Sequence, residues 1–512
     1  MKTLYRGGKI ITMEQDFTAE ALLTDGGRIA AVGSEERLAA LGAQRVVDLA
    51  GGALLPGFLD AHSHFSQVSA AQGQAALGGG GDMAETIRDF LRRTAPAPGD
   101  WVIARDYDPA PGEAPPGLAA LDAMAEGHPL LIQYRSGHMA LLSSEALRLC
   151  GITPHTPDPA GGRIGREDGR LTGYLEENAF FLCREHIPVP GGAALAAACD
   201  AAQRVYASHG ITTVQEGLFT AQMAPMYDLM RGRMKLDLVA YAEPASLSAA
   251  REAVRGEHLR LGGVKIFLDG SPQGRTAWMT EPYTGGENYR GSGTMTDEAV
   301  EEAMLLSGRE GVQLLAHCNG DAAAEQFLRC LARAEETCPT LASLRPVIIH
   351  AQLIRPDQLR RAKELGAMVS FFVAHVWHWG DVHVRNFGPE RARRISPAAS
   401  ALALGLPFTF HQDTPVVEPD MLETIWCAAE RRTRSGAVLG GGERIGVGDA
   451  LRAVTSTAAY QYFEEDRKGS LRPGKAADLV LLSGDPLTVP PDKLRDIRVL
   501  ATVKDGETIY EA

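Results

Sequence analysis

The sequence has no long hydrophobic run and no surplus of positive charge. No apolar stretch approaches the ~20 residues that a membrane-spanning helix needs, and the first residues lack the charged-then-apolar pattern of a leader. The formal net charge is −13, whereas a nucleic-acid-binding surface requires an excess of Lys and Arg. We therefore expect a cytoplasmic protein with neither nucleic acid nor a membrane as partner.

Cysteine is scarce and follows no pattern. The 512 residues include seven cysteines, none of them in a Cys-x-x-Cys pair. An odd and scattered set favours reduced thiols over a disulfide framework, which agrees with a cytoplasmic location. The remaining composition, 45% hydrophobic and 22% charged, is typical of a globular protein with a large core.

Both ends of the chain consist of short apolar strands separated by turns. Residues 1–55 contain strands such as Lys9–Thr12 and Ala21–Thr24, punctuated by glycine pairs. Residues 466–512 have the same texture, with strands at 478–482 and 498–503. We expect the two ends to pair into one small domain.

The middle of the chain, residues 56–465, alternates strands with helices, the pattern of a parallel sheet or barrel. Eight strands are predicted, at 57–61, 211–215, 236–240, 263–268, 312–316, 347–349, 367–371 and 408–410. The interval between the first two strands is too long for one crossover. Residues 66–200 are therefore predicted to form an insertion that covers the ends of the barrel strands, where barrels carry their sites.

The first barrel strand runs directly into His62-Ser63-His64. Because residues i and i+2 of a strand point to the same side, both imidazoles can reach one point at the carboxyl end of the strand. An isolated His-x-His is more often a surface or core feature than a ligand pair. A metal site is favoured only if later strands supply further ligands.

Later strands do end in suitable side chains. Strand four carries Lys265, strand five ends at His317, strand six at His350, and Asp413 follows strand eight. Neutral imidazoles and carboxylate oxygens suit zinc, with manganese, iron or cobalt as rivals. Asp413 has an alternative role as a turn residue, because Asp-Thr-Pro is good turn chemistry.

Taken together, several motifs resemble those of one family. They are Gly263–Arg275 with its Asp-Gly-Ser, Gly137-His138, His350-Ala-Gln-Leu, and the closing stretch Gly469–Asp478. The chain resembles the amidohydrolase superfamily of metal-dependent hydrolases. Within it, the chain is similar to amidohydrolase family 3, the branch of the YtcJ-like proteins and the N-substituted formamide deformylases.

The resemblance implies an α/β fold, a (β/α)8 TIM barrel at residues 56–465 with a β-sandwich built from residues 1–55 and 466–512. It also implies two divalent ions per chain, and we expect zinc because the ligand set suits that metal. His62, His64 and Asp413 would hold one ion, and His317 and His350 the other.

The resemblance further implies that a carboxylated Lys265 bridges the two ions. An ammonium group has no lone pair with which to ligate a cation, whereas a carbamate offers two oxygens. The alternative is an ordinary lysine paired with Asp269 or with a substrate carboxylate.

The implied reaction is attack of a metal-activated hydroxide on an amide carbonyl, with Asp413 accepting the water proton and passing it to the leaving nitrogen. His138 is a second catalytic candidate. The candidate substrate-binding residues are Glu177, Asp269, Arg275, Trp278, His378 and His411. His411-Gln412-Asp413 departs from the Ser-Asp pair that is frequent in the branch. Glu177 has the alternative of a surface helix start, and the aromatic stretch 371–381 that of a dimer contact or plain packing.

Three functions remain open at this point. The first is hydrolysis of a non-peptide carbon–nitrogen amide bond in a small molecule, such as an N-substituted formamide or an N-acyl compound. The second is deamination of an amino-heterocycle, and the third is a non-catalytic metal-binding scaffold on the same fold. The expected partners are a small-molecule substrate and a second copy of the chain in a homodimer.

Overall fold

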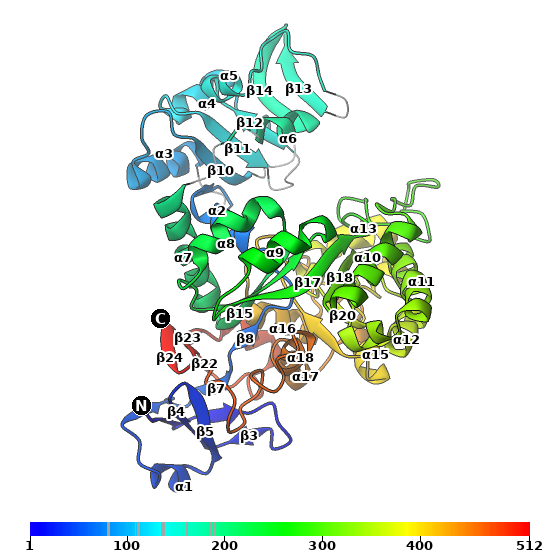
Figure 1. The fold of residues 1–512 in the computed structure, drawn as a ribbon. Helices are drawn as coiled ribbons and strands as arrows, with labels where there is room; N and C mark the ends of the chain where they lie inside the picture. Colours follow the sequence, from blue (N-terminus) through cyan, green and yellow to red (C-terminus); the bar gives the residue numbers. More distant parts are fainter. Residues whose placement is uncertain are drawn as a thin grey trace. The chain divides into compact units, whose positions relative to one another are not determined.

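The computed structural model of the chain describes residues 1–78, 82–107, 109, 113–134, 139–159, 162–184, 186–187 and 191–512. The chain divides into two compact units (Figure 1). The larger unit contains residues 1–68 and 199–512, and the smaller unit contains residues 69–198.

A curled sheet of eight parallel strands forms the centre of the larger unit, and each strand pairs with the next one in sequence order (Figure 1). The strands are β8 (Phe58–Leu59), β15 (Ile211–Phe219), β16 (Asp237–Ala242), β17 (Leu259–Phe267), β18 (Gln313–Cys318), β19 (Val347–His350), β20 (Met368–Phe371) and β21 (Phe408–Phe410). The two edge strands approach each other just past their carboxyl ends, where the backbone N–H of His64 donates to the carbonyl of Thr414 over 2.9 Å. All eight strands predicted from the sequence are present, in the predicted order.

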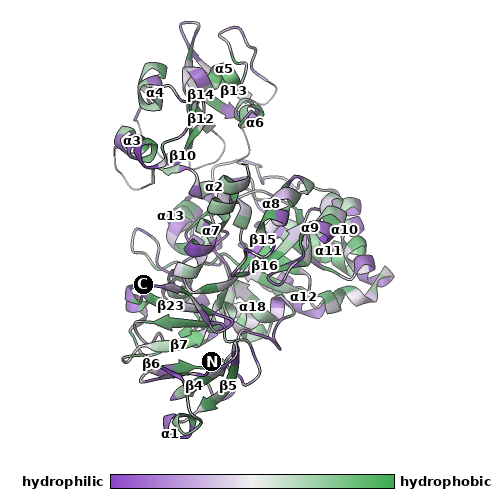
Figure 2. Cartoon of the chain, turned by 60° about the vertical axis from the view of Figure 1, so that its left-hand side comes forward, coloured by the Kyte–Doolittle hydropathy of each residue, from purple (hydrophilic) through white to green (hydrophobic). Residues whose placement is uncertain are grey.

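Helices alternate with the strands of the curled sheet, and most of them lie on its outer face (Figure 1). They are α7 (Gly192–Ser208), α8 (Ala224–Met230), α9 (Leu247–Ala253), α10 (Asp297–Glu310), α11 (Asp321–Thr337), α12 (Pro356–Glu364), α13 (His375–Phe387), α14 (Pro389–Ala392), α15 (Ala398–Leu404), α16 (Met421–Glu430), α17 (Val447–Ala453) and α18 (Ser456–Gln461). Strands covered on both faces are largely apolar; every residue of β16 is buried, and Figure 2 shows this strand mostly in apolar colours. Within the described ranges, no helix combines the length and the apolarity that crossing a bilayer requires.

The interior of the curled sheet is packed with side chains. Leu59, Val239 and Leu315 point inward and meet Ala458 of α18 and Tyr462 just beyond that helix. Tyr462 donates its hydroxyl proton to the carbonyl of Asp60 over 2.5 Å. The end of the sheet opposite the strands' carboxyl ends is thereby closed, as in a barrel whose lumen is core.

The two ends of the chain form two further sheets in the larger unit. One has the strand order β5 (Arg28–Gly33), β4 (Ala21–Asp25), β1 (Thr3–Arg6), β6 (Arg45–Asp48). The other has the order β24 (Glu507–Glu511), β23 (Val499–Lys504), β22 (Leu479–Leu482), β7 (Ala53–Pro56), β2 (Lys9–Ile11), β3 (Thr18–Ala19). Tyr5 and Leu22 of the first sheet share an apolar cluster with Ile10, Leu54 and Leu479 of the second.

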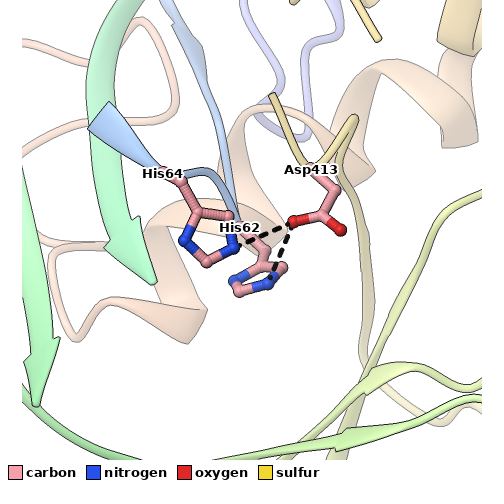
Figure 3. Close-up of side chains that lie close together, drawn as sticks. All are labelled: His62, His64 and Asp413. Atoms are coloured by element: carbon pink, nitrogen blue, oxygen red, sulfur yellow. Dashed lines mark ion pairs between the residues drawn. The ribbon is translucent and has the colours of Figure 1, made fainter. Parts of the chain in front are cut away.

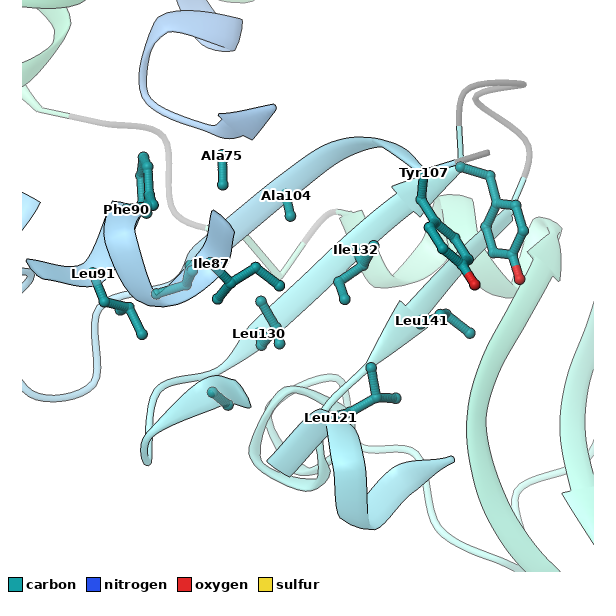
Figure 4. Packing of buried hydrophobic residues seen from close by; sticks show 13 residues of the cluster. Ala75, Ile87, Phe90, Leu91, Ala104, Tyr107, Leu121, Leu130, Ile132 and Leu141 are labelled. Atoms are coloured by element: carbon teal, nitrogen blue, oxygen red, sulfur yellow. The ribbon is translucent and has the colours of Figure 1, made fainter. Parts of the chain in front are cut away.

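The smaller unit is built on a six-stranded mixed sheet. Its strand order is β13 (Gly162–Glu167), β14 (Arg170–Glu177), β12 (Met139–Leu142), β11 (Leu130–Tyr134), β10 (Val102–Tyr107), β9 (Ala75–Ala76). Helices α3 (Met83–Thr94) and α4 (Leu118–Ala125) place Ile87 and Leu121 against Leu130 and Ile132 of the sheet (Figure 4). The unit therefore has an apolar core of its own.

The expectation that all cysteines are reduced is wrong for one pair. A disulfide joins Cys150, at the end of α5 (Ser144–Leu149), to Cys183 in α6 (Asn178–Arg184). Both helices pack in one apolar cluster of the smaller unit, which brings the two Cα atoms to 5.3 Å. A sequence separation of 33 residues carries no sign of that proximity. Among the described residues, the other five cysteines form no disulfide.

Candidate metal centre

Three side chains converge at the carboxyl ends of the barrel strands (Figure 3). One carboxylate oxygen of Asp413, Oδ1, lies 3.4 Å from Nε2 of His62 and 3.2 Å from Nε2 of His64. One ligand atom from each residue falls within 4.8 Å of the others. His62 is fully buried, and Asp413 Oδ1 is buried without a hydrogen-bond partner. The arrangement leaves one carboxylate oxygen and two imidazole nitrogens facing a common point.

The β15 residue Gln215 fixes the ring of His62. Its Oε1 lies 2.6 Å from Nδ1 of His62, while its Nε2 donates to the carbonyl of Ala61 over 2.7 Å. Because the amide nitrogen is committed to a carbonyl, Oε1 accepts the Nδ1 proton of His62. The lone pair of His62 is then on Nε2, the atom that faces Asp413. Burial, and then the neighbouring Lys265, hold the pKa of His62 well below its usual value, so the ring is neutral.

Glu216, the next residue of β15, stands beside His64. Its Oε2 accepts the backbone N–H of Ser66 over 2.8 Å, and its Oε1 lies 3.7 Å from Nδ1 of His64. Burial lowers the pKa of His64, but the carboxylates of Asp413 and Glu216 outweigh burial and raise that pKa to about 9. Burial raises the pKa of Asp413, and the surrounding histidines outweigh it and hold that pKa well below the usual range. A cation binding here would displace a proton from His64.

Lys265 of β17 also contacts this group of residues, through His62. Its side chain is buried, and its Nζ lies 3.2 Å from Nε2 of His62. Burial lowers the pKa of Lys265 to about 7, although Asp413 opposes the shift. Lys265 is not paired with Asp269, whose oxygens have other partners.

His317 and His350, at the ends of β18 and β19, form the second half of the centre. Their ring centres are 4.5 Å apart, and Nε2 of His350 lies 3.9 Å from Oδ2 of Asp413. Asp269 Oδ1 lies 3.1 Å from Nδ1 of His317, and Nε2 of that ring is 3.2 Å from the side-chain nitrogen of Asn319. Burial, and then His317, hold the pKa of His350 well below its usual value.

Asp269 is a positioning residue for His317. Besides its contact with that imidazole, its carboxylate accepts the backbone N–H groups of Trp278, Asn319 and Gly320, at 3.0, 2.9 and 2.7 Å. It is buried, and its two oxygens are occupied by the protein itself. The substrate-binding role expected of Asp269 stays a prediction.

Among the remaining predicted substrate residues, His411 contacts a candidate metal ligand, and Arg275 and His378 have other partners. His411 is buried, with Nε2 3.1 Å from Nδ1 of His350, and burial lowers its pKa to about 3. Arg275 and Trp278 belong to the loop after β17, where Arg275 donates to the carbonyl of Thr284 over 2.9 Å. The ring of His378 in α13 is held by Glu423 at 2.8 Å and by Arg434 at 3.2 Å.

Two further predicted residues, Glu177 and His138, belong to the insertion predicted at residues 66–200. Glu177 ends β14 in the smaller unit. His138 lies outside the described residues. Their expected contacts with substrate remain predictions.

The donor set fits divalent metal ions. Buried neutral imidazoles together with a charged carboxylate are the ligands that zinc and its neighbours in the periodic table prefer. The unsatisfied Oδ1 of Asp413 and Nδ1 of His64 are buried polar atoms, which proteins seldom leave without a partner. His62, His64 and Asp413 would hold one ion, and His350 with His317 would contribute to another.

Sequence reasoning missed three residues that orient this centre: Gln215, Glu216 and Ser370. All three belong to strands of the curled sheet. Polar residues within an otherwise buried apolar strand are a usable signal, because a buried polar group must find a partner. Thr-Thr-Val-Gln-Glu at 212–216 carries that signal.

Comparison with known proteins identifies the family that this chain resembles. A model of the "Amidohydrolase family" matches residues 45–510. The chain is 26% identical to the putative amidohydrolase YtcJ of Bacillus subtilis, covering 100% of each protein. It is 27% identical to the N-substituted formamide deformylase of Arthrobacter pascens, covering 96% of this chain and 95% of that one.

Among solved structures, an uncharacterised metal-dependent hydrolase of Pyrococcus furiosus has the same fold. It superposes with a TM-score of 0.78 at 24% identity, covering 95% of this chain and 100% of that one. Because the family model spans most of the sequence and the buried histidines and aspartate stand at the strand ends, this chain belongs to the amidohydrolase family.

Proposed function

We propose that the protein hydrolyses a non-peptide carbon–nitrogen amide bond in a small molecule, an N-substituted formamide or another N-acyl compound, at a centre for two divalent metal ions, zinc first among them. The observation that carries this proposal is the buried group of His62, His64 and Asp413 with Lys265 against it. The formamide class is suggested by the relative from Arthrobacter pascens, whose name states that activity.

Bridging of the two ions by a carboxylated Lys265 is part of the proposal. The unprotonated amine adds to the carbon of carbon dioxide, forming an N–C bond and a carbamate while one proton leaves the nitrogen. The buried position of Nζ, 3.2 Å from a neutral imidazole, supports this role, because no carboxylate of the described residues forms an ion pair with this amine. An ammonium at this point would repel the cations.

Asp413 is assigned the proton transfers. Divalent ions held at this centre would lower the pKa of a bound water and polarise the substrate carbonyl. Asp413 is ionised, and its Oδ1 has no hydrogen-bond partner, so it can accept a proton from the attacking water. It then delivers that proton to the leaving nitrogen, which departs as a neutral amine.

The test is a substrate panel with zinc-loaded protein, comprising N-substituted formamides, N-acyl amino acids and amino-heterocycles. Release of formate or another carboxylate together with an amine is the expected result. Ammonia released from a heterocycle would replace the proposal with the deaminase function. A fully loaded protein that turns over none of these compounds would favour the non-catalytic scaffold. D413N, loaded in the same way, serves as the inactive control.

A further inference from the structure

His411 makes contacts that the proposed reaction does not explain. It follows β21 two residues before Asp413, and its side chain is fully buried. Its Nε2 lies 3.1 Å from Nδ1 of His350, and its Nδ1 lies 2.7 Å from the hydroxyl oxygen of Ser370 on the neighbouring strand β20. Three side chains from three adjacent strands thus form a chain of hydrogen bonds that ends on a candidate metal ligand.

The donor and acceptor roles in this series of hydrogen bonds decide whether Nε2 of His350 can bind a metal ion. Two neutral imidazoles that share a hydrogen bond contribute one N–H and one lone pair. If His411 carries its proton on Nδ1 and donates it to Ser370, its Nε2 accepts the Nδ1 proton of His350. The lone pair of His350 is then on Nε2, the nitrogen that faces Asp413.

If the hydrogen bonds run the other way, His350 cannot act as a metal ligand. If the Ser370 hydroxyl donates to Nδ1 of His411, Nε2 of His411 carries the proton and donates to Nδ1 of His350. The remaining proton of His350 is then on Nε2, where it blocks metal ligation. Nδ1 of His350 has no access to an ion in either case, because His411 occupies it.

We propose that His411 is a positioning residue that selects the Nδ1-protonated tautomer of His350 and thereby sets the affinity of the second metal position. This rests on the proposed paired centre. The partner of a metal-bound imidazole commonly fixes its tautomer and orientation. Here that partner is another histidine, His411, which is itself hydrogen-bonded to Ser370.

The experiment titrates metal-free protein with Zn²⁺ alone and measures both dissociation constants and the final metal content. Wild-type protein is expected to bind two ions. H411F keeps a buried ring but offers His350 no acceptor, so the second ion should bind about 10- to 100-fold more weakly while the first is unchanged. H411Q supplies an amide oxygen in place of the imidazole nitrogen and should restore affinity to within a few fold of wild type.

Two further variants complete the design. S370A removes only one hydroxyl and leaves the Nδ1–H of His411 without an acceptor, so it should also weaken the binding of the second ion. This variant provides the test if H411F does not fold. H383F removes a buried histidine that contacts His375 at 3.1 Å and none of the metal ligands described above, and it should bind both ions normally.

The outcomes separate the inference from the proposed function. A second ion bound with wild-type affinity by H411F, or by S370A where H411F is unfolded, overturns the role of His411 while leaving the paired centre intact. Wild-type protein that holds only one ion overturns the paired centre and this inference with it. Equal melting temperatures of the metal-free variants would show that the affinity change is not a general loss of stability.

Discussion

Gly217 and His62 are so close that a Cβ atom on Gly217 would lie 2.6 Å from Cε1 of His62. The same atom would lie 3.0 Å from Cε1 of His64, and the backbone here is held by the N–H of Gly217, which donates to the carbonyl of Ser63 over 2.7 Å. The two imidazoles therefore rest on a surface that has no room for a side chain.

G217A is expected to displace both imidazoles and to weaken metal binding about tenfold or more, since ligand orientation is set by such supporting contacts. Metal content after dialysis and the zinc dissociation constants measure this. G442A is the matched control, because no atom lies within 4 Å of the Cβ it would add. Wild-type affinity in G217A would show that the imidazoles can move without loss.

D413N should lose about 10²- to 10⁴-fold in kcat/KM, the range that general acid–base catalysis supplies. Asparagine has the same shape and keeps one oxygen that can bind a metal ion, but its amide does not take up a proton from water. Turnover of the substrate identified in the panel, normalised to bound metal, measures this loss. Near-normal turnover in a metal-loaded variant would remove Asp413 from the proton transfers.

K265A should lose the bridge between the ions, and a small carboxylate such as acetate should partly restore metal content and turnover by supplying the missing oxygens. K265R places a permanently protonated guanidinium at this position, which takes up no carbon dioxide. It should be inactive with or without acetate. Activity in K265R would show that the bridging carbamate is not required.

Asp237 ties the barrel to the carboxyl end of the chain. Its Oδ2 lies 2.6 Å from Nζ of Lys468, 3.2 Å from Arg467 and 3.4 Å from Nζ of Lys504. D237N should lower the free energy of unfolding by about 1.5–3 kcal/mol in denaturant titrations, the range of a hydrogen bond to a charged group, because Lys468 keeps Glu464 as a partner at 2.7 Å. D228N, which breaks an exposed pair with Arg231, should cost no more than about 1 kcal/mol. Similar costs for the two variants would contradict this.

The cost of D237N should also depend on pH. Burial raises the pKa of Asp237, but Lys468, His258 and the other cations outweigh burial and hold it well below its usual value. A carboxyl group with a depressed native pKa stabilises the fold above its unfolded pKa of about 3.9, and that contribution is lost as the pH falls through the native value. The difference between wild type and D237N should be full at pH 6 and shrink below about pH 4.

The candidate metal ligands could be identified from local pattern. His62, His64, Lys265, His350 and Asp413 all stand at or just past apolar strands whose type and order are legible in the sequence, because each strand is short, apolar and bounded by turns. Since parallel strands end at one edge, residues at their carboxyl ends were expected to converge, and these five do.

The roles of the polar residues around those candidate ligands could be assigned only from the tertiary structure. Gln215, Ser370 and Asp269 are ordinary polar residues in the sequence, and only their distances to imidazole nitrogens reveal what they hold. The disulfide between Cys150 and Cys183 was likewise invisible, since it depends on two helices packing in one cluster.

What the sequence alone determined is thus the eight-stranded α/β architecture and the ligand types at its strand ends, because both depend on periodicity and on neighbours along the chain. The tertiary structure decided which nitrogen of each histidine faces the centre and which polar groups enforce that choice. Hydrogen-bond direction depends on atoms brought together from distant strands at about 3 Å, and no local pattern encodes such a contact.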